Sequence, residues 1–131
     1  REQAASFGVE VHDMRHWQSD FRPNLTGPIY LSLDLDVLDP AFVPGVSHHE
    51  PGGLSTRELL QLIHGLGVPI LAADIVEFNP TRDPAGTTAA VAAKLLKEVA
   101  ACIMEWSGGS KHAYQAEPGL SRSLSNQAQK H

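Results

Sequence analysis

Apolar and polar residues alternate along two stretches of the chain, as they do in β-strands that bury one face. These stretches are residues 7–11 and 29–37. A third strand is predicted in PILAADIVEFNP, residues 69–80, which is apolar on both of its faces. Strands of that composition are typical of sheets that are covered on both sides.

Two further stretches carry apolar residues at helical spacing. The sequence STRE at residues 55–58 has the form of a capping box, and it predicts a helix that begins after Ser55 and ends near Gly67. A second helix is predicted to be capped by Thr87 or Thr88. Its apolar stripe consists of Ala92, Leu95, Val99, Ile103 and Trp106. The order strand, strand, helix, strand, helix predicts an α/β fold with right-handed crossovers.

Composition adds limits to this picture. The chain has 131 residues, of which 42% are hydrophobic, and it begins at Arg1, so we expect one globular domain or part of a longer chain. After residue 106 periodicity stops and Gly, Ser, Gln and Asn dominate, so residues 107–131 are expected to form a disordered tail behind an ordered segment 1–106. The net charge of −5 and the lack of a long apolar run argue against nucleic acid and membrane partners.

Candidate chemistry begins with two carboxylates in YLSLDLDVLDP, residues 30–40. Asp34 and Asp36 are one strand repeat apart, so an extended strand places both on one face at its carboxyl end. Ligands of α/β sheets collect at that end, and hard oxygen ligands suit Mg²⁺, Mn²⁺ or Ca²⁺. A bound cation offsets the repulsion between the two groups. The alternative is a solvated strand end with hydrogen-bond donors nearby.

Three separated motifs narrow these alternatives. SLDLDVLDPAFVPG at 32–45, GGLS at 52–55 and ADIVEFNPTRD at 73–83 together resemble the C-terminal half of the ureohydrolases, the family of arginases, agmatinases and formimidoylglutamases. The sequence of residues 40–55 is most similar to that of plant-type arginases. The resemblance implies the C-terminal part of a three-layer α/β/α arginase-like fold with a mainly parallel sheet.

The resemblance also implies roles for single residues. Asp34 is expected to bridge two Mn²⁺ ions and Asp36 to bind one, in a binuclear centre that activates water for attack on a guanidinium carbon. Glu77 of VEFNP is expected to pair with the substrate guanidinium, and His48 to face the site and orient Glu77 or the substrate. Asp74, three residues before Glu77, is expected to have a structural hydrogen-bonding role.

The rest of such a centre is missing from this sequence. The family has upstream Gly-Gly-Asp-His and Asp-Ala-His-x-Asp segments that supply the remaining metal ligands, and neither occurs here. We therefore expect this chain to be part of a longer enzyme and to be inactive alone. The main hypothesis is manganese-dependent hydrolysis of L-arginine to L-ornithine and urea. The alternatives are an agmatinase, which converts agmatine to putrescine and urea, and a non-catalytic homologue. Resemblance further implies a small guanidino substrate, a homo-oligomer and an intracellular location, mitochondrial if plant-type.

Overall fold

A computed structural model describes residues 2–107, and within them two strands pair in parallel. The helices and strands are α1 (Glu2–Ser6), β1 (Ile29–Asp34), α2 (Thr56–His64), β2 (Ile70–Val76) and α3 (Thr87–Ser107). Single 3-10 turns are η1 (Met14–His16), η2 (Leu35–Val37) and η3 (Pro80–Arg82). The register places Leu33 opposite Ile75 and Ser32 opposite Asp74. This arrangement, with α2 as the crossover between parallel strands, confirms the predicted α/β fold.

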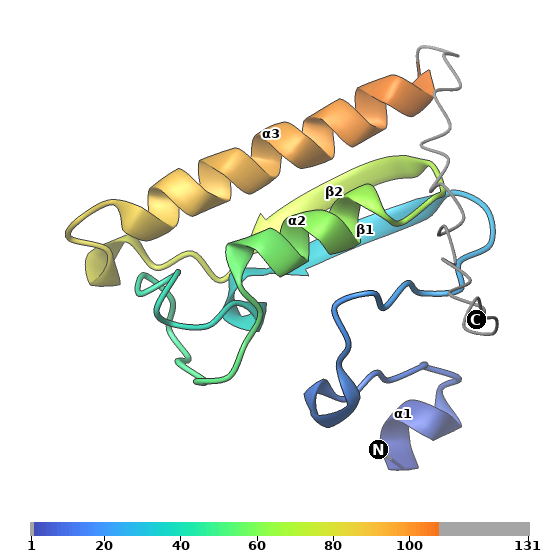
Figure 1. Ribbon diagram of the computed structural model, residues 1–131, viewed down its shortest axis with the longest axis horizontal. Helices are drawn as coiled ribbons and strands as arrows, with labels where there is room; N and C mark the ends of the chain where they lie inside the picture. Colours follow the sequence, from blue (N-terminus) through green and yellow to red (C-terminus); the bar gives the residue numbers. More distant parts are fainter. Residues whose placement is uncertain (1, 108–131) are drawn as a thin grey trace, which may run out of the picture.

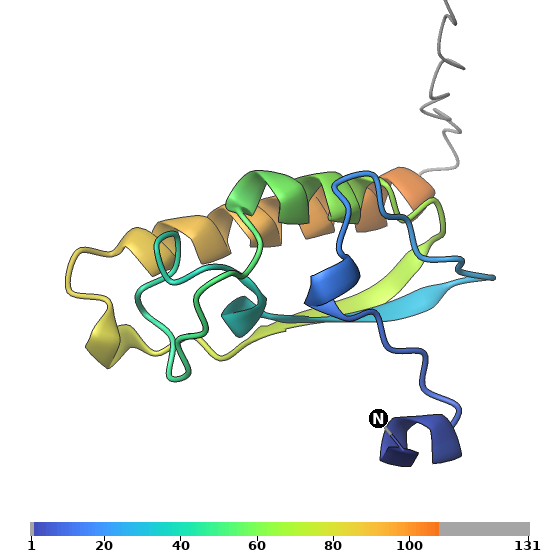
Figure 2. The same ribbon diagram turned by 60° about the horizontal axis from the view of Figure 1, so that its bottom comes forward.

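Helices α2 and α3 lie over the same face of the sheet (Figure 1, Figure 2). Alternate residues of β1, such as Leu33, point into the layer between sheet and helices. The apolar core there includes Leu33, Leu35, Leu59, Leu60, Ile63, Leu95 and Val99. The opposite face of the sheet is open within residues 2–107: Tyr30 is 62% exposed and Leu71 is 71% exposed. The expectation that the third strand is covered on both faces is therefore wrong for the described residues.

The predicted strand at residues 7–11 is also wrong. Helix α1 ends at Ser6, and Phe7, Val9 and Val11 are exposed without strand structure. A strand needs a neighbour for its backbone N–H and C=O groups, and in the described residues β1 and β2 pair with each other. Figure 1 shows this N-terminal arm lying apart from the sheet.

Both predicted helices form, but α2 ends at His64 with Gly65, and not Gly67, as its C-cap. The N-terminal caps of the two helices differ in origin. The capping box of α2 is confirmed: Glu58 N–H donates to Ser55 Oγ over 3.2 Å, and Ser55 N–H donates to the Glu58 carboxylate over 2.8 Å. In α3 the acceptor is not a threonine. Asp83 accepts from the backbone N–H groups of Thr88 and Ala89, at 3.1 and 2.8 Å. The capping group of α3 therefore comes from the segment after β2.

Helix α3 reaches Ser107, so the expected tail does not begin at that residue; residues 108–131 of the expected tail lie outside the described residues. No helix within residues 2–107 combines the length and the apolar character that crossing a membrane requires.

Candidate functional site

The two candidate carboxylates at the end of β1 are separated by a turn. Asp34 is the last residue of β1, and its Oδ1 accepts the N–H of Asp36 over 2.8 Å, so it caps the 3-10 turn η2. Asp36 therefore lies on the turn, and the expectation that both side chains share one face of a continuous strand is wrong. The turn has a clear packing reason, because it buries Leu35 completely.

The loop between β1 and α2 is packed and hydrogen-bonded. Its apolar residues Leu38, Val43, Val46 and Leu54 are buried. The Asp39 carboxylate accepts the N–H groups of Ala41 and Gly52 over 2.9 and 2.8 Å, and these bonds lower the pKa of Asp39. A Cβ on Gly53 would lie 2.6 Å from Asp39 N, so the close approach of the two ends of the loop requires glycine. The loop that carries His48 is thus a fixed element at the carboxyl ends of the strands.

Glu77 has an unusual backbone conformation. Its φ is 67°, and it is the one non-glycine residue within 2–107 with positive φ. Such a conformation costs on the order of 1 kcal/mol and persists where neighbouring contacts impose it. Here Phe78 forms an antiparallel bridge with Val46, and Asn79 N–H donates to Gly45 C=O over 2.8 Å. The chain therefore turns sharply at Glu77, directly after β2.

Three side chains from these segments meet. Asp36, His48 and Glu77 each offer a ligand atom, and the three atoms lie within 4.8 Å of one another. His48 Nδ1 is 3.4 Å from Asp36 Oδ2. Asp36 Oδ1 is buried and has no hydrogen-bond partner, which leaves an acceptor for a cation or a donor from a substrate. Carboxylate oxygens with an imidazole nitrogen form a donor set that suits Mn²⁺, so the residues present fit part of a metal centre.

Of the four predicted site residues, the structure thus brings three together. Asp34 is not in this group of three; it is exposed, and its described contact is with the backbone of Asp36. The ligand atoms of His48 and Glu77, both expected to contact substrate, lie within 4.8 Å of that of Asp36. The positive φ of Glu77 was not predicted from the sequence, because glutamate gives no local signal for it.

Asp74 has the hydrogen-bonding role expected of it. It accepts bonds from the hydroxyls of Tyr30 and Ser32, the second over 2.7 Å, on the open face of the sheet. These bonds, that from Tyr30 most strongly, lower the pKa of Asp74, and the same contact raises the pKa of Tyr30.

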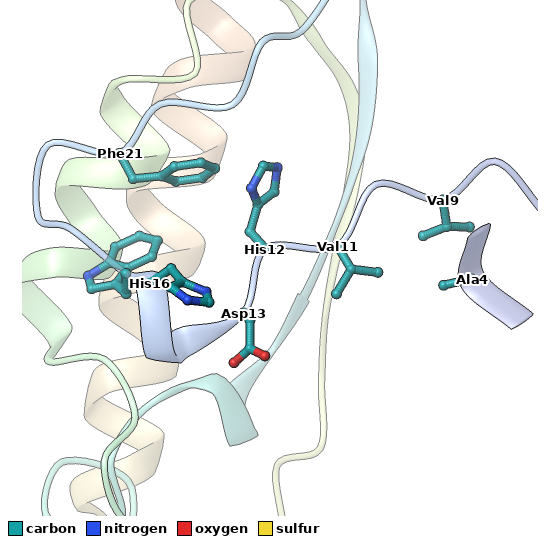
Figure 3. A pocket seen from close by; sticks show the side chains of 8 residues that line it. Ala4, Val9, Val11, His12, Asp13, His16 and Phe21 are labelled. Atoms are coloured by element: carbon teal, nitrogen blue, oxygen red, sulfur yellow. The ribbon is translucent and has the colours of Figure 1, made fainter. Parts of the chain in front are cut away.

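A hollow of about 390 Å³ lies at the N-terminal arm, and its lining includes His12, Asp13 and His16. Phe21 also lines the hollow, and the centroid of its ring is 4.5 Å from that of His12. Figure 3 shows His12 and Asp13 pointing in opposite directions from the backbone. The hollow is therefore not a second site of converging ligands.

Known proteins resemble this chain over most of its described length. The model of the arginase family matches residues 1–102. "Arginase 1, mitochondrial" of Arabidopsis thaliana is 52% identical over 112 residues, which are 79% of this chain and 32% of that protein. An agmatinase of Halalkalibacterium halodurans is 42% identical over 81 residues, 59% of this chain and 28% of the agmatinase.

The fold comparison agrees. The solved arginase from Medicago truncatula superposes with a TM-score of 0.70 at 42% identity, covering 79% of this chain and 35% of that structure. This chain spans about a third of the length of the curated relatives it matches. On the family match and this identity, the chain belongs to the arginase family.

Proposed function

We propose that residues 1–106 of this chain are the C-terminal part of a ureohydrolase catalytic domain. The longer protein that carries it, here termed the complete enzyme, hydrolyses L-arginine to L-ornithine and urea with manganese. The observation that carries this proposal is the meeting of Asp36, His48 and Glu77 at the carboxyl ends of two parallel strands. The similarity to plant arginases supports arginine as the substrate.

Metal binding falls to the end of β1. Asp36, with its unpartnered Oδ1, and Asp34 would hold manganese, and the remaining ligands of a binuclear centre would come from segments outside this chain. When bound, manganese supplies Lewis acidity that makes water a nucleophile near neutral pH. His48 Nδ1 lies 3.4 Å from Asp36 Oδ2, beside this site.

Substrate recognition falls to Glu77. A guanidinium is planar and cationic, so a carboxylate can accept two parallel N–H bonds from it, which fixes both distance and plane. The turn at Glu77 presents its carboxylate next to Asp36 and His48. His48 orients Glu77 or the bound guanidinium.

The reaction then follows from this placement. Water adds to the guanidinium carbon and loses a proton. The bond from that carbon to Nε of arginine breaks, Nε takes up a proton and leaves as the side-chain amine of ornithine, and the carbon leaves in urea. Fixing the guanidinium against Glu77 contributes by holding the carbon in one orientation toward the attacking water.

Agmatine is the rival substrate, because an agmatinase is also among the similar proteins. It has the same guanidino group and lacks the α-carboxylate, so residues outside this chain decide between the two. Urea release from each substrate by the complete enzyme with Mn²⁺ separates them: we expect a higher kcat/KM for arginine, and a higher value for agmatine would favour the alternative. A complete enzyme that turns over neither substrate would favour the non-catalytic homologue. A mitochondrial location, which the names of the plant relatives support, stays a prediction. Homo-oligomerisation also stays a prediction.

A further inference from the structure

The loop that carries His48 is bound to the segment that follows Glu77. Ser47, the residue before His48, receives two bonds from that segment: Asn79 Nδ2 donates to Ser47 Oγ over 3.0 Å, and Arg82 Nη1 donates to Ser47 C=O over 3.1 Å. Figure 1 shows the two segments at the same end of the sheet. The positions of His48 and Glu77 are therefore linked by direct contacts and not only through the core.

Only one orientation of the Asn79 side-chain amide satisfies its hydrogen bonds. Its Oδ1 accepts from both the N–H and the hydroxyl of Thr81, at 3.1 and 2.6 Å. A backbone N–H can only donate, so the side-chain oxygen must face Thr81 and the NH₂ group must face Ser47. Both ends of this short side chain are thereby occupied. Asn79 is only partly exposed and fills the gap between the loop and the segment.

The base of this contact is buried. Gly45 N–H donates to Thr88 Oγ1 over 2.7 Å, and Thr88 is fully buried. A Cβ on Gly45 would lie 2.5 Å from Asp83 Cβ, so the loop touches the cap of α3 at a point where only glycine fits. Asp83, 8% exposed, is itself held by the first N–H groups of α3. The loop is thus anchored at Gly45, and the bonds that Asn79 and Arg82 donate to Ser47 are its attachments nearest to His48 from that segment.

We propose that Asn79 is a positioning residue: through its bond to Ser47 it fixes His48 relative to Glu77, and so sets the geometry that binds the guanidino group. This role rests on the proposed function of the site. Asn79 itself contacts neither metal nor substrate in this scheme.

The test compares Asn79→Ala, Ser47→Ala and the double variant in the complete enzyme, with Asn24→Ala as a matched control at an exposed position. Loss of one hydrogen bond that orients a binding group is expected to raise KM for arginine about three- to tenfold, with kcat changed less. The manganese content should stay that of the unchanged enzyme. The bond between Ser47 and Asn79 is lost in either single variant, and Asn79→Ala also loses the bonds from Thr81. The double variant should therefore resemble Asn79→Ala rather than show the product of the two effects. Multiplying effects, or an unchanged KM in both single variants, would overturn the role.

A second measurement needs no activity. Hydrogen exchange of the peptide covering residues 45–49, in the absence of substrate, should be faster in Asn79→Ala and in Ser47→Ala than in the unchanged enzyme or in Asn24→Ala. Equal exchange in all four proteins would show that the contact does not hold the loop. If Asn79→Ala fails to fold, Ser47→Ala still decides the matter from the loop side. If the unchanged enzyme releases no urea, the proposed function fails, while the exchange rates still confirm or reject the contact.

Discussion

His48 Nδ1 lies 3.4 Å from Asp36 Oδ2. The side chain of His48, in the loop, is 83% exposed, whereas that of Asp36 is only 19% exposed. The other oxygen of Asp36 is buried without a partner. An unsatisfied acceptor in that position is costly for folding unless a ligand uses it. An available acceptor, Asp36 Oδ1, therefore lies beside His48.

Replacing Asp36 or Asp34 by asparagine should abolish urea release by the complete enzyme and lower its manganese content. The two variants remove a charged metal ligand while they keep the side-chain shape. In Asp34→Asn the amide oxygen can still accept the Asp36 N–H, so the turn η2 should persist and folding should be unaffected. Metal analysis and thermal unfolding of the purified variants check both points, with Asp20→Asn as an exposed control. Full manganese content with normal turnover would remove these residues from the metal centre.

Glu77→Gln should keep the manganese and weaken the handling of the guanidinium. A charge-assisted bidentate contact becomes a neutral and partly mismatched one, which costs about 1.5–3 kcal/mol, or roughly 10- to 150-fold in kcat/KM. Steady-state kinetics with arginine measure the effect, and Glu105→Gln on the exposed side of α3 is the control. Unchanged kinetics would make Glu77 a bystander.

Glu77→Gly separates strain from function. Glycine adopts a φ of 67° without steric cost, so this variant should be more stable than the unchanged protein by about 1 kcal/mol while it loses activity. Denaturant unfolding checks the gain. The matched control is Glu50→Gly, an exposed loop position without positive φ, where no gain is expected. A loss of stability at residue 77 would mean that its side chain contributes more to folding than its backbone conformation costs.

Asp83 should make stability depend on pH. Burial alone raises the pKa of this carboxyl, but the bonds from the backbone N–H groups of Ala89 and Thr88 outweigh it, and the pKa lies below the ordinary 3.8. A group with a lowered folded-state pKa stabilises the protein above its unfolded-state pKa, and this contribution is lost as pH falls through the folded-state value. Asp83→Asn should therefore be less stable than the unchanged protein at pH 7, and the difference should shrink on acidification below pH 3.8. Unfolding curves of both proteins at pH 7 and below pH 3.8 measure the difference in stability. A difference that stays constant with pH would mean that the charge of Asp83 plays no part.

What the sequence predicts well here is what neighbouring residues decide. The cap of α2 needs only Ser55 and Glu58, three positions apart, and β1 and β2 follow from runs of apolar residues. Two of the errors involve distant partners. Residues 7–11 alternate like a strand but have no neighbouring strand in residues 2–107, and the cap of α3 comes from Asp83 because the β2–α3 connection folds back onto Gly45.

The site divides in the same way. Motif resemblance was sufficient to select Asp36, His48 and Glu77, three residues whose side chains the structure brings together. It was not sufficient to place them, because the turn at Asp36 depends on burying Leu35 and the positive φ of Glu77 depends on contacts with the loop at Gly45 and Val46. Asn79 lies in the motif ADIVEFNPTRD, but the motif does not predict its contact, since its partner Ser47 is remote in sequence.

The most direct measurement is urea release from arginine, with excess Mn²⁺, by the complete enzyme and by the 131-residue chain alone. Asp34, Asp36, His48 and Glu77 do not provide enough ligands for two manganese ions, and the open sheet face with Tyr30 and Leu71 should make the isolated chain self-associate. The complete enzyme is expected to release urea, and the isolated chain is expected to release no more than a metal-only blank. Turnover by the isolated chain would contradict a shared active site, and no turnover of arginine by the manganese-loaded complete enzyme would contradict the proposed function.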